Sequence, residues 1–183
     1  MSEIEVPIEQ ASEHIHHEAL HSRENWIGKV ALSSAIFAVL AAVAALNAGH
    51  HANEAMLAQI RASDHWNFFQ AKGIKSAILQ TKIALMSEAG RNANYLAEKK
   101  HEDEQKFEDY KKEQEEISQE AKAEEKESKI QLNKHETLAK SVTFFQVSIA
   151  VSAISVLVRR RRFWHLSLVF GGVGIAFFGL GLI

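Results

Sequence analysis

Three histidines near the N-terminus have a spacing that could bind a transition metal. His14, His17 and His21 are three and four residues apart, so they share one face of a predicted helix. Imidazole nitrogens beside a carboxylate are common ligands of zinc and related metals, and histidine also changes its charge near neutral pH. No second shell of ligands is recognisable around them. A solvated helix face is therefore the simpler interpretation, and we expect no cofactor.

Catalytic chemistry has little support elsewhere in the chain. There is no cysteine, which excludes a thiolate metal site and a cysteine nucleophile. No activated-nucleophile motif and no glycine-rich phosphate loop is present. Acidic and basic residues are mixed rather than gathered into a basic tract, which argues against nucleic-acid binding. The sequence predicts a protein that is not an enzyme.

A second group of residues that could form a functional site lies between Ala62 and Lys75. Helical spacing places Trp66, Gln70 and Gly73 on one face of the predicted helix. Such residues either fix the packing and register of two helices or form a site for a partner or a ligand. The candidate residues of this motif are Asp64, Trp66, Phe69, Gln70, Lys72 and Lys75.

Apolar stretches organise the rest of the chain. The runs 30–46, 141–158 and 163–183 contain no Asp, Glu, Lys or Arg. At about 1.5 Å per residue, roughly 20 helical residues cross a hydrocarbon core of about 30 Å. We therefore expect an all-α protein with three transmembrane helices. Their predicted bounds are 27–48, 141–158 and 163–183, and a polar helical segment, 1–26, precedes the first.

An arginine turn joins the second and third predicted spans. It consists of Arg159, Arg160, Arg161 and Arg162, residues 159–162. Positive charge in a short loop favours the cytoplasmic side of the membrane. If this turn is cytoplasmic, the chain crosses the membrane twice between the N-terminus and the turn. The N-terminus is then predicted to be cytoplasmic as well. The long loop 49–140 and the C-terminus are then expected on the opposite side.

The loop 49–140 is predicted to be an antiparallel, coiled-coil-like helical hairpin that turns near residues 90–94. Its first half carries an apolar stripe at helical spacing, and we expect four further large residues to widen it. Its second half is mostly charged and can cover only part of this stripe, so we expect the remainder to bind a partner, most simply another copy. The stripe is Leu57, Ile60, Phe68, Ala71, Ile74, Ile78 and Leu85, and the widening residues are Trp66, Phe69, Ile83 and Met86.

The motif also carries a family resemblance. The pattern Asp64-x-Trp66-x-x-x-Gln70-Ala71-Lys72, the charged second half of the loop and the arginine turn resemble the family catalogued as domain of unknown function 4337. Gly73 departs from that pattern, because a more ordinary helix former is expected there. The resemblance implies a multi-pass protein of the bacterial inner (cytoplasmic) membrane without an assigned activity.

These features lead to three functional hypotheses. The leading one is a self-associating structural or scaffolding membrane protein. The alternatives are an oligomeric pore or transporter component and an accessory or sensor subunit that binds another protein through the loop. A pore needs a polar path, and the spans offer few polar groups for one: Ser33, Ser34, Asn47, Gln146, Ser148, Ser152 and Ser155. The expected partners are the lipid bilayer, further copies of the chain and an unidentified protein.

Overall fold

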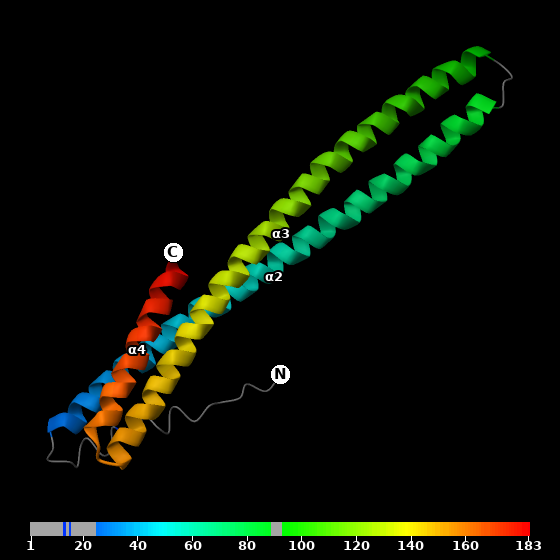
Figure 1. Cartoon of the computed structure of the whole chain (residues 1–183). Coiled ribbons are helices and arrows are strands. Elements are labelled where there is room, and N and C mark those ends of the chain that lie inside the picture. Colours follow the sequence, from blue (N-terminus) through cyan, green and yellow to red (C-terminus); the bar gives the residue numbers. More distant parts are fainter. Residues whose placement is uncertain (1–12, 14, 16–24, 89–92) are drawn as a thin grey trace. The chain divides into compact units, whose positions relative to one another are not determined.

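The computed structural model describes residues 13, 15, 25–88 and 93–183. These residues form three helices and no strand: α2 (Asn25–Glu88), α3 (Ala93–Leu157) and α4 (Arg161–Leu182) (Figure 1). The predicted all-α fold is confirmed. The predicted turn at 90–94 overlaps the first residues of α3, and residues 89–92 lie outside the described part of the chain.

Two of the helices are unusually long. α2 contains 64 residues and α3 contains 65. Neither contains a proline, because the only proline of the chain is Pro7, and without one no helical hydrogen bond is lost. Each of these helices therefore runs without a break from an apolar stretch into a charged or mixed one.

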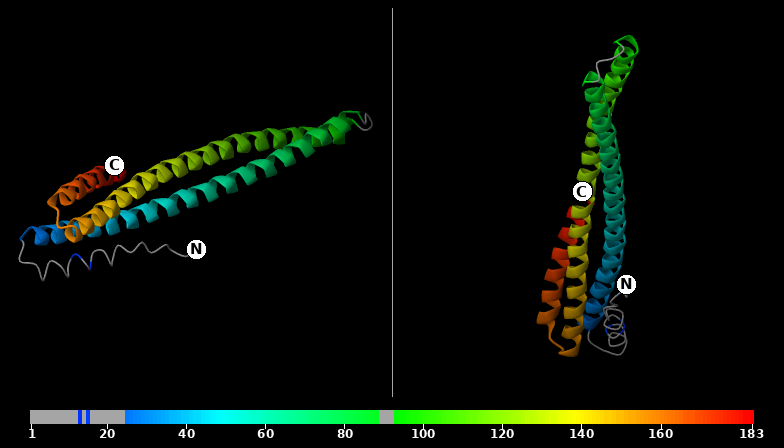
Figure 2. Two further views of the ribbon diagram at one scale, coloured as in Figure 1. Left: turned by 60° about the horizontal axis from the view of Figure 1, so that its bottom comes forward. Right: turned by 90° about the vertical axis from the view of Figure 1, so that its right-hand side faces the viewer.

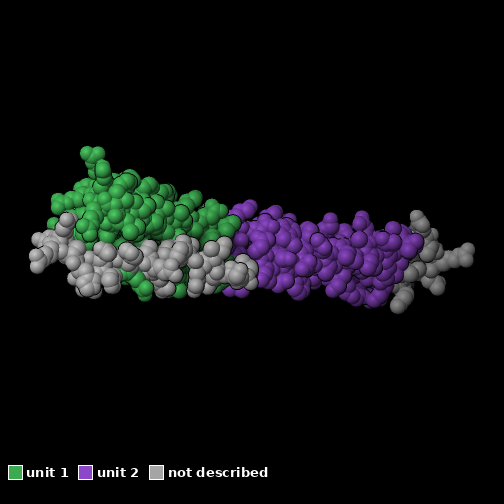
Figure 3. All heavy atoms as spheres, turned by 90° about the horizontal axis from the view of Figure 1, so that it is seen from below, with its two compact units in different colours: residues 1–53, 131–183 green, residues 54–130 purple. Residues whose placement is uncertain are grey.

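The chain divides into two compact units (Figure 3). One consists of residues 1–53 and 131–183 and is called here the apolar unit. The other consists of residues 54–130 and is called the arm. In both views of Figure 2, the parts of α2 and α3 that belong to the arm run side by side.

Each of the three helices contains a stretch long and apolar enough to cross a membrane, judged by length and composition. The helices of the apolar unit pack through glycines on α4. Gly171 lies against the ring of Phe37, where an added Cβ would overlap the ring atoms. A Cβ on Gly174 would come within 2.8 Å of the Phe145 ring, and the rings of Phe37 and Phe145 are 6.0 Å apart. These glycines let α4 approach its neighbours closely.

Serine hydroxyls hold the same helices together. Ser148 Oγ on α3 donates a 2.7 Å hydrogen bond to the carbonyl of Ser167 on α4, and Ser152 Oγ donates to Ser167 Oγ at 3.0 Å. Trp164 Nε1 donates to Ser33 Oγ on α2 at 3.2 Å. Ser34 is also buried, but its hydroxyl has no partner within the described residues. Hydroxyls that could have lined a polar path therefore lie inside the helix packing.

The arginine turn is shorter than predicted. Helix α3 ends at Leu157 and α4 begins at Arg161, so Arg161 and Arg162 form the first turn of α4. Arg159 has a φ of 52°, a left-handed conformation that lets the chain reverse between the helices. Arg160 N donates to Ser155 O at 3.1 Å, and the Arg161 guanidinium lies 5.7 Å from the centre of the Trp26 ring. All four arginines are exposed at this end of the apolar unit.

Candidate functional site on the arm

The two helices of the arm meet along a seam that combines small and polar residues with a few large apolar ones. On α2, Ala55, Ala58 and Ala62 are buried, and Ser128 Oγ of α3 donates a 2.9 Å hydrogen bond to the carbonyl of Ala55. One set of buried or partly buried residues on α3 alternates at steps of four and three, the spacing expected for helices that wind around each other. They are Asp103, Phe107, Tyr110, Gln114, Ile117, Ala121, Glu124 and Ser128.

Ion pairs across the seam fix its register. Arg61 Nε lies 3.0 Å from Glu124 Oε2, and His65 Nδ1 lies 3.3 Å from Glu120 Oε2. Further along the arm, Lys72 pairs with Glu113 and Lys82 pairs with Asp103. From one pair to the next, the residue number on α2 rises by as much as the residue number on α3 falls. The antiparallel register is therefore the same from Arg61 to Lys82.

The sequence motif divides between this seam and the solvent. Trp66 Nε1 donates a 2.8 Å hydrogen bond to Glu125 Oε1, and its ring meets that of Phe69 edge-on at 5.4 Å. Lys72, besides its ion pair, lies 4.8 Å from the centre of the Tyr110 ring. These three motif residues belong to the packing of α2 against α3.

Gly73 has a structural role at the same level. Gln114 Nε2 donates a 3.0 Å hydrogen bond to the carbonyl of Phe69, and it lies where the side chain of residue 73 would begin. A Cβ on Gly73 would come within 2.8 Å of that nitrogen. The glycine thus makes room for a glutamine that binds the backbone of the opposite helix.

Three other motif residues face outward. Asp64, Gln70 and Lys75 are exposed, and within the described residues they make no hydrogen bond or ion pair. The motif is therefore not one cluster: Trp66, Phe69 and Lys72 serve the hairpin, whereas Asp64, Gln70 and Lys75 remain available to something outside it.

The predicted apolar stripe also faces outward. Its six large members are between 49% and 63% exposed, and Ala71 is exposed as well. The four residues expected to widen it, Trp66, Phe69, Ile83 and Met86, are instead partly buried. For Trp66, Phe69 and Ile83 that expectation was wrong, because they lie on the opposite face of α2, which closes the hairpin. Met86 does lie beside the stripe, in the groove described next.

A shallow groove widens the stripe near the far end of the arm. It has a volume of about 750 Å³ and an almost wholly apolar lining. The lining residues are Ile74, Ala77, Ile78, Thr81, Lys82, Leu85 and Met86. The outward face of α2 thus presents both exposed apolar side chains and a hollow that could receive a partner's side chains. We refer to this face, from Leu57 to Leu85, as the outer face.

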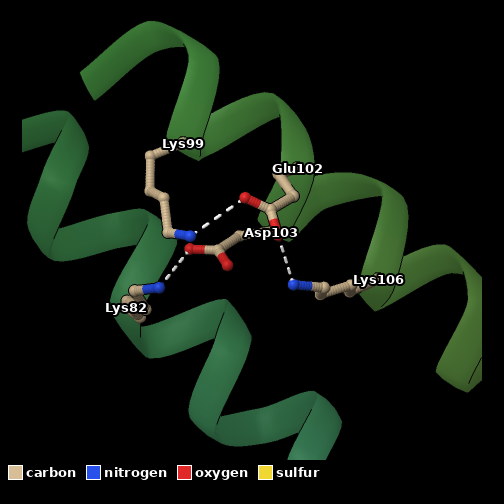
Figure 4. Close-up of polar contacts among 5 residues, drawn as sticks. All are labelled: Lys82, Lys99, Glu102, Asp103 and Lys106. Atoms are coloured by element: carbon tan, nitrogen blue, oxygen red, sulfur yellow. Dashed lines mark hydrogen bonds and ion pairs between the residues drawn. The ribbon is translucent and has the colours of Figure 1, made fainter. Parts of the chain in front are cut away.

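A cluster of charges closes the same end of the arm (Figure 4). Glu102 accepts hydrogen bonds from Lys106 at 2.5 Å and from Lys99 at 2.9 Å, and these bonds lower the pKa of Glu102 to about 2. Lys82 reaches Asp103 at 2.5 Å, and the Asp103 side chain is almost fully buried. The Lys82–Asp103 pair joins α2 to α3, whereas the bonds of Glu102 stay within α3.

The metal hypothesis receives no support from the described residues. They contain no group of three or more metal-binding side chains. His14, His17 and His21 lie outside the described residues, so their arrangement stays a prediction. His51, within the apolar unit, uses Nδ1 in a 2.6 Å hydrogen bond with Gln131 Oε1.

The chain belongs to the DUF4337 family, a domain of unknown function, because a sequence model of the family matches residues 26–183. No curated protein and no solved structure matches the chain.

Proposed function

We propose that this member of the DUF4337 family is a membrane-anchored structural protein that self-associates through the outer face of its arm. The apolar unit anchors the chain in the bilayer, and the arm brings copies together. In this proposal the chain catalyses no reaction and holds no cofactor. Its proposed role is to form this assembly.

The observation that carries the proposal is the exposure of the outer face. The hairpin closes on the opposite face of α2 and leaves Leu57, Ile60, Phe68, Ile74 and Ile78 in solvent. A monomeric soluble surface rarely shows a contiguous apolar patch of this kind, and such patches usually mark a binding surface. Because α3 occupies the opposite side of α2 and no described residue covers the outer face, this face is available to a partner.

The membrane placement rests on composition and charge. The three apolar helices have the length and hydropathy of transmembrane segments, and Arg159 to Arg162 are exposed at the α3–α4 turn. With that turn in the cytoplasm, the N-terminus is cytoplasmic, and the arm and C-terminus lie outside. The proposed location is the bacterial inner membrane.

The pore alternative is less well supported than assembly. Ser148 and Ser152 would have to line the path, but their hydroxyls bind Ser167 inside the helix packing. The accessory-subunit alternative uses the same outer face and differs only in the identity of the partner. A test of whether two copies of the chain associate therefore separates the accessory-subunit alternative from self-association.

The test uses two full-length copies with different affinity tags, co-expressed and extracted in mild detergent. We expect each tag to recover both copies. Ile74→Glu combined with Ile78→Glu should abolish the recovery, because two charges replace exposed apolar side chains of the outer face. Gln59→Glu combined with Gln80→Glu adds the same charge at exposed positions off that face and should leave it intact. Recovery of one tag only from the unmutated chain would contradict the proposal.

A further inference from the structure

Basic side chains gather at one end of the apolar unit without acidic partners. The arginines of residues 159–162 are all exposed there, and so is Lys29 at the start of α2. Within the described residues none of these side chains forms an ion pair. The acidic residues described in the apolar unit are Glu13, which is exposed, and Glu136, which lies about 30 Å along α3 from the turn. We call this end, with residues 159–162 and Lys29, the basic end.

The backbone of the turn adds to the positive charge of the basic end. Helix α4 begins at Arg161, and its N-cap residue, Arg160, makes no side-chain hydrogen bond to the first turn. Among the described residues, no acceptor binds the backbone N–H groups of Arg161 and Arg162. The dipole of α4 also places partial positive charge at its N-terminus. Backbone and side chains therefore favour an anion at the same place.

Two tryptophans lie at the basic end. The guanidinium of Arg161 lies 5.7 Å from the centre of the Trp26 ring, and Trp164 Nε1 donates a 3.2 Å hydrogen bond to Ser33 Oγ. Tryptophan is enriched at the level of the lipid headgroups, because its ring is apolar and its N–H is polar. In an apolar unit that spans a bilayer, these rings place the arginines at the height of the lipid phosphates.

Exposed apolar side chains flank the arginines on both sides. Leu157 and Val158, immediately before Arg159, are 68% and 51% exposed, and Leu166 on α4 is 45% exposed. A soluble phosphate has no apolar part that could contact them. A phospholipid carries its phosphate at one end and its acyl chains at the other, in the order that the surface presents cations and apolar side chains. The surface therefore fits an amphipathic ligand with an anionic head.

From these features we infer that the basic end binds the headgroup of an anionic phospholipid. Arg159 and Arg160, the two arginines between the helices, donate hydrogen bonds to the phosphate oxygens, a geometry that suits guanidinium groups. An anionic headgroup is preferred to a zwitterionic one, because the excess of cations repels an ammonium group. The inference rests on the membrane anchoring in the proposed function and does not depend on self-association.

The chain's own tryptophans can report the binding of lipid. It contains three tryptophans, so the background Trp66→Phe leaves only Trp26 and Trp164, both at the basic end. The full-length protein would be reconstituted in phosphatidylcholine vesicles that contain phosphatidylglycerol or phosphatidylcholine with brominated acyl chains as the quencher. We expect the brominated phosphatidylglycerol to quench at a concentration about 10-fold lower, since each basic side chain near the surface strengthens the attraction to anionic lipid.

Two double variants separate the charge of the turn from its fold. Arg159→Gln combined with Arg160→Gln should remove most of this roughly 10-fold preference, whereas Arg159→Lys combined with Arg160→Lys should keep most of it. The arginines at 161 and 162 stay in both variants, so the turn keeps the positive charge that favours its side of the membrane. The matched control is Lys122→Gln combined with Lys126→Gln, which removes the same charge at exposed positions of the arm and should leave the preference unchanged.

Equal quenching by the two brominated lipids would overturn the lipid site and leave the proposed function standing. An unchanged preference in the glutamine variant would do the same, because the arginines would then be engaged by another group, such as the glutamates of residues 1–24. Relief of the quenching by free glycerol phosphate would show that the basic end takes a soluble phosphate ester instead. If neither lipid quenched the tryptophans, the apolar unit would not lie in a bilayer, and the proposed membrane anchoring would fail together with the lipid site.

Discussion

Gln114 lies directly over Gly73, and the two residues depend on each other. The glutamine amide donates a 3.0 Å hydrogen bond to the carbonyl of Phe69, and the missing Cβ of residue 73 provides the space that the amide occupies. A glycine inside a helix costs about 1 kcal/mol relative to alanine. In the arm this cost is offset by a hydrogen bond between the two helices.

A double-mutant cycle measures this dependence. In the chain that lacks the glutamine, Gln114→Ala, we expect Gly73→Ala to stabilise the arm by about 1 kcal/mol through helix propensity. In the unmutated chain the same change should give little gain, because the new Cβ displaces the amide and removes its bond. Thermal unfolding followed by circular dichroism reports both values. Equal effects in the two backgrounds would mean that the residues are independent.

The glycines of α4 give a matched pair of substitutions. Gly171→Ala should destabilise the apolar unit by about 1–3 kcal/mol, since the added methyl group overlaps the Phe37 ring. Gly172→Ala meets no atom within 4 Å and should be neutral or stabilising by up to about 1 kcal/mol. Unfolding in detergent would show the contrast. The packing described for α4 would be wrong if Gly172→Ala were the more damaging change.

Replacement of two buried serines by alanine should change the stability of the apolar unit in opposite directions. Ser148→Ala removes the 2.7 Å hydrogen bond to Ser167 and should cost about 0.5–1 kcal/mol. Ser34→Ala removes a buried hydroxyl that has no partner within the described residues, and should stabilise the apolar unit by about 1 kcal/mol. Apparent melting temperatures of the two variants, measured in one detergent, test the sign of each change.

Acid should weaken the far end of the arm through Glu102. Hydrogen bonds from Lys106 and Lys99 lower the pKa of this carboxyl from 4.5 to about 2. Because the folded-state pKa is the lower one, the stabilisation is complete above about pH 4.5 and is lost as the pH falls toward about 2. The exposed position makes the contribution small.

The chemical shift of the Glu102 carboxyl carbon, followed from pH 7 to pH 2, gives this pKa directly. Glu102→Gln should remove the corresponding part of the acid dependence of arm unfolding. Glu108→Gln serves as the control, because Glu108 forms no ion pair within the described residues. A midpoint near the ordinary value for Glu102 would contradict the ion pairing seen in Figure 4.

The sequence predicts the helices better than it predicts their contacts. Long apolar runs and helical periodicity were sufficient to predict an all-α fold in which the loop 49–140 is helical. The exposed apolar stripe from Leu57 to Leu85 was also predicted, since a mostly charged second helix could not cover it. These features depend on composition and periodicity, which are properties of the chain itself.

The α2 side of the seam within the arm was missed because its fully buried residues are small. A search for apolar periodicity selects Leu57, Ile60 and Ile74, whereas the hairpin closes on Ala55, Ala58 and Ala62. The signal was present as three small residues at alternating steps of three and four. On α3 the same steps connect Asp103, Gln114 and Ser128, whose polarity concealed the repeat.

The contacts of the motif residues were harder to predict from the sequence than the helices were. Lys72 and Lys75 have the same side chain and are three residues apart, yet one pairs with Glu113 and the other faces solvent. The difference depends on where α3 lies. The sequence of α2 alone does not contain that information.

The mass of the complex in mild detergent shows whether the chain self-associates through the outer face. One chain has a mass of 20.5 kDa, and light scattering with subtraction of the detergent gives the protein mass of the assembly. We expect a defined multiple of the chain mass, which falls to the mass of a single chain in the variant with Ile74→Glu and Ile78→Glu. A single-chain mass for the unmutated protein across mild detergents would contradict it.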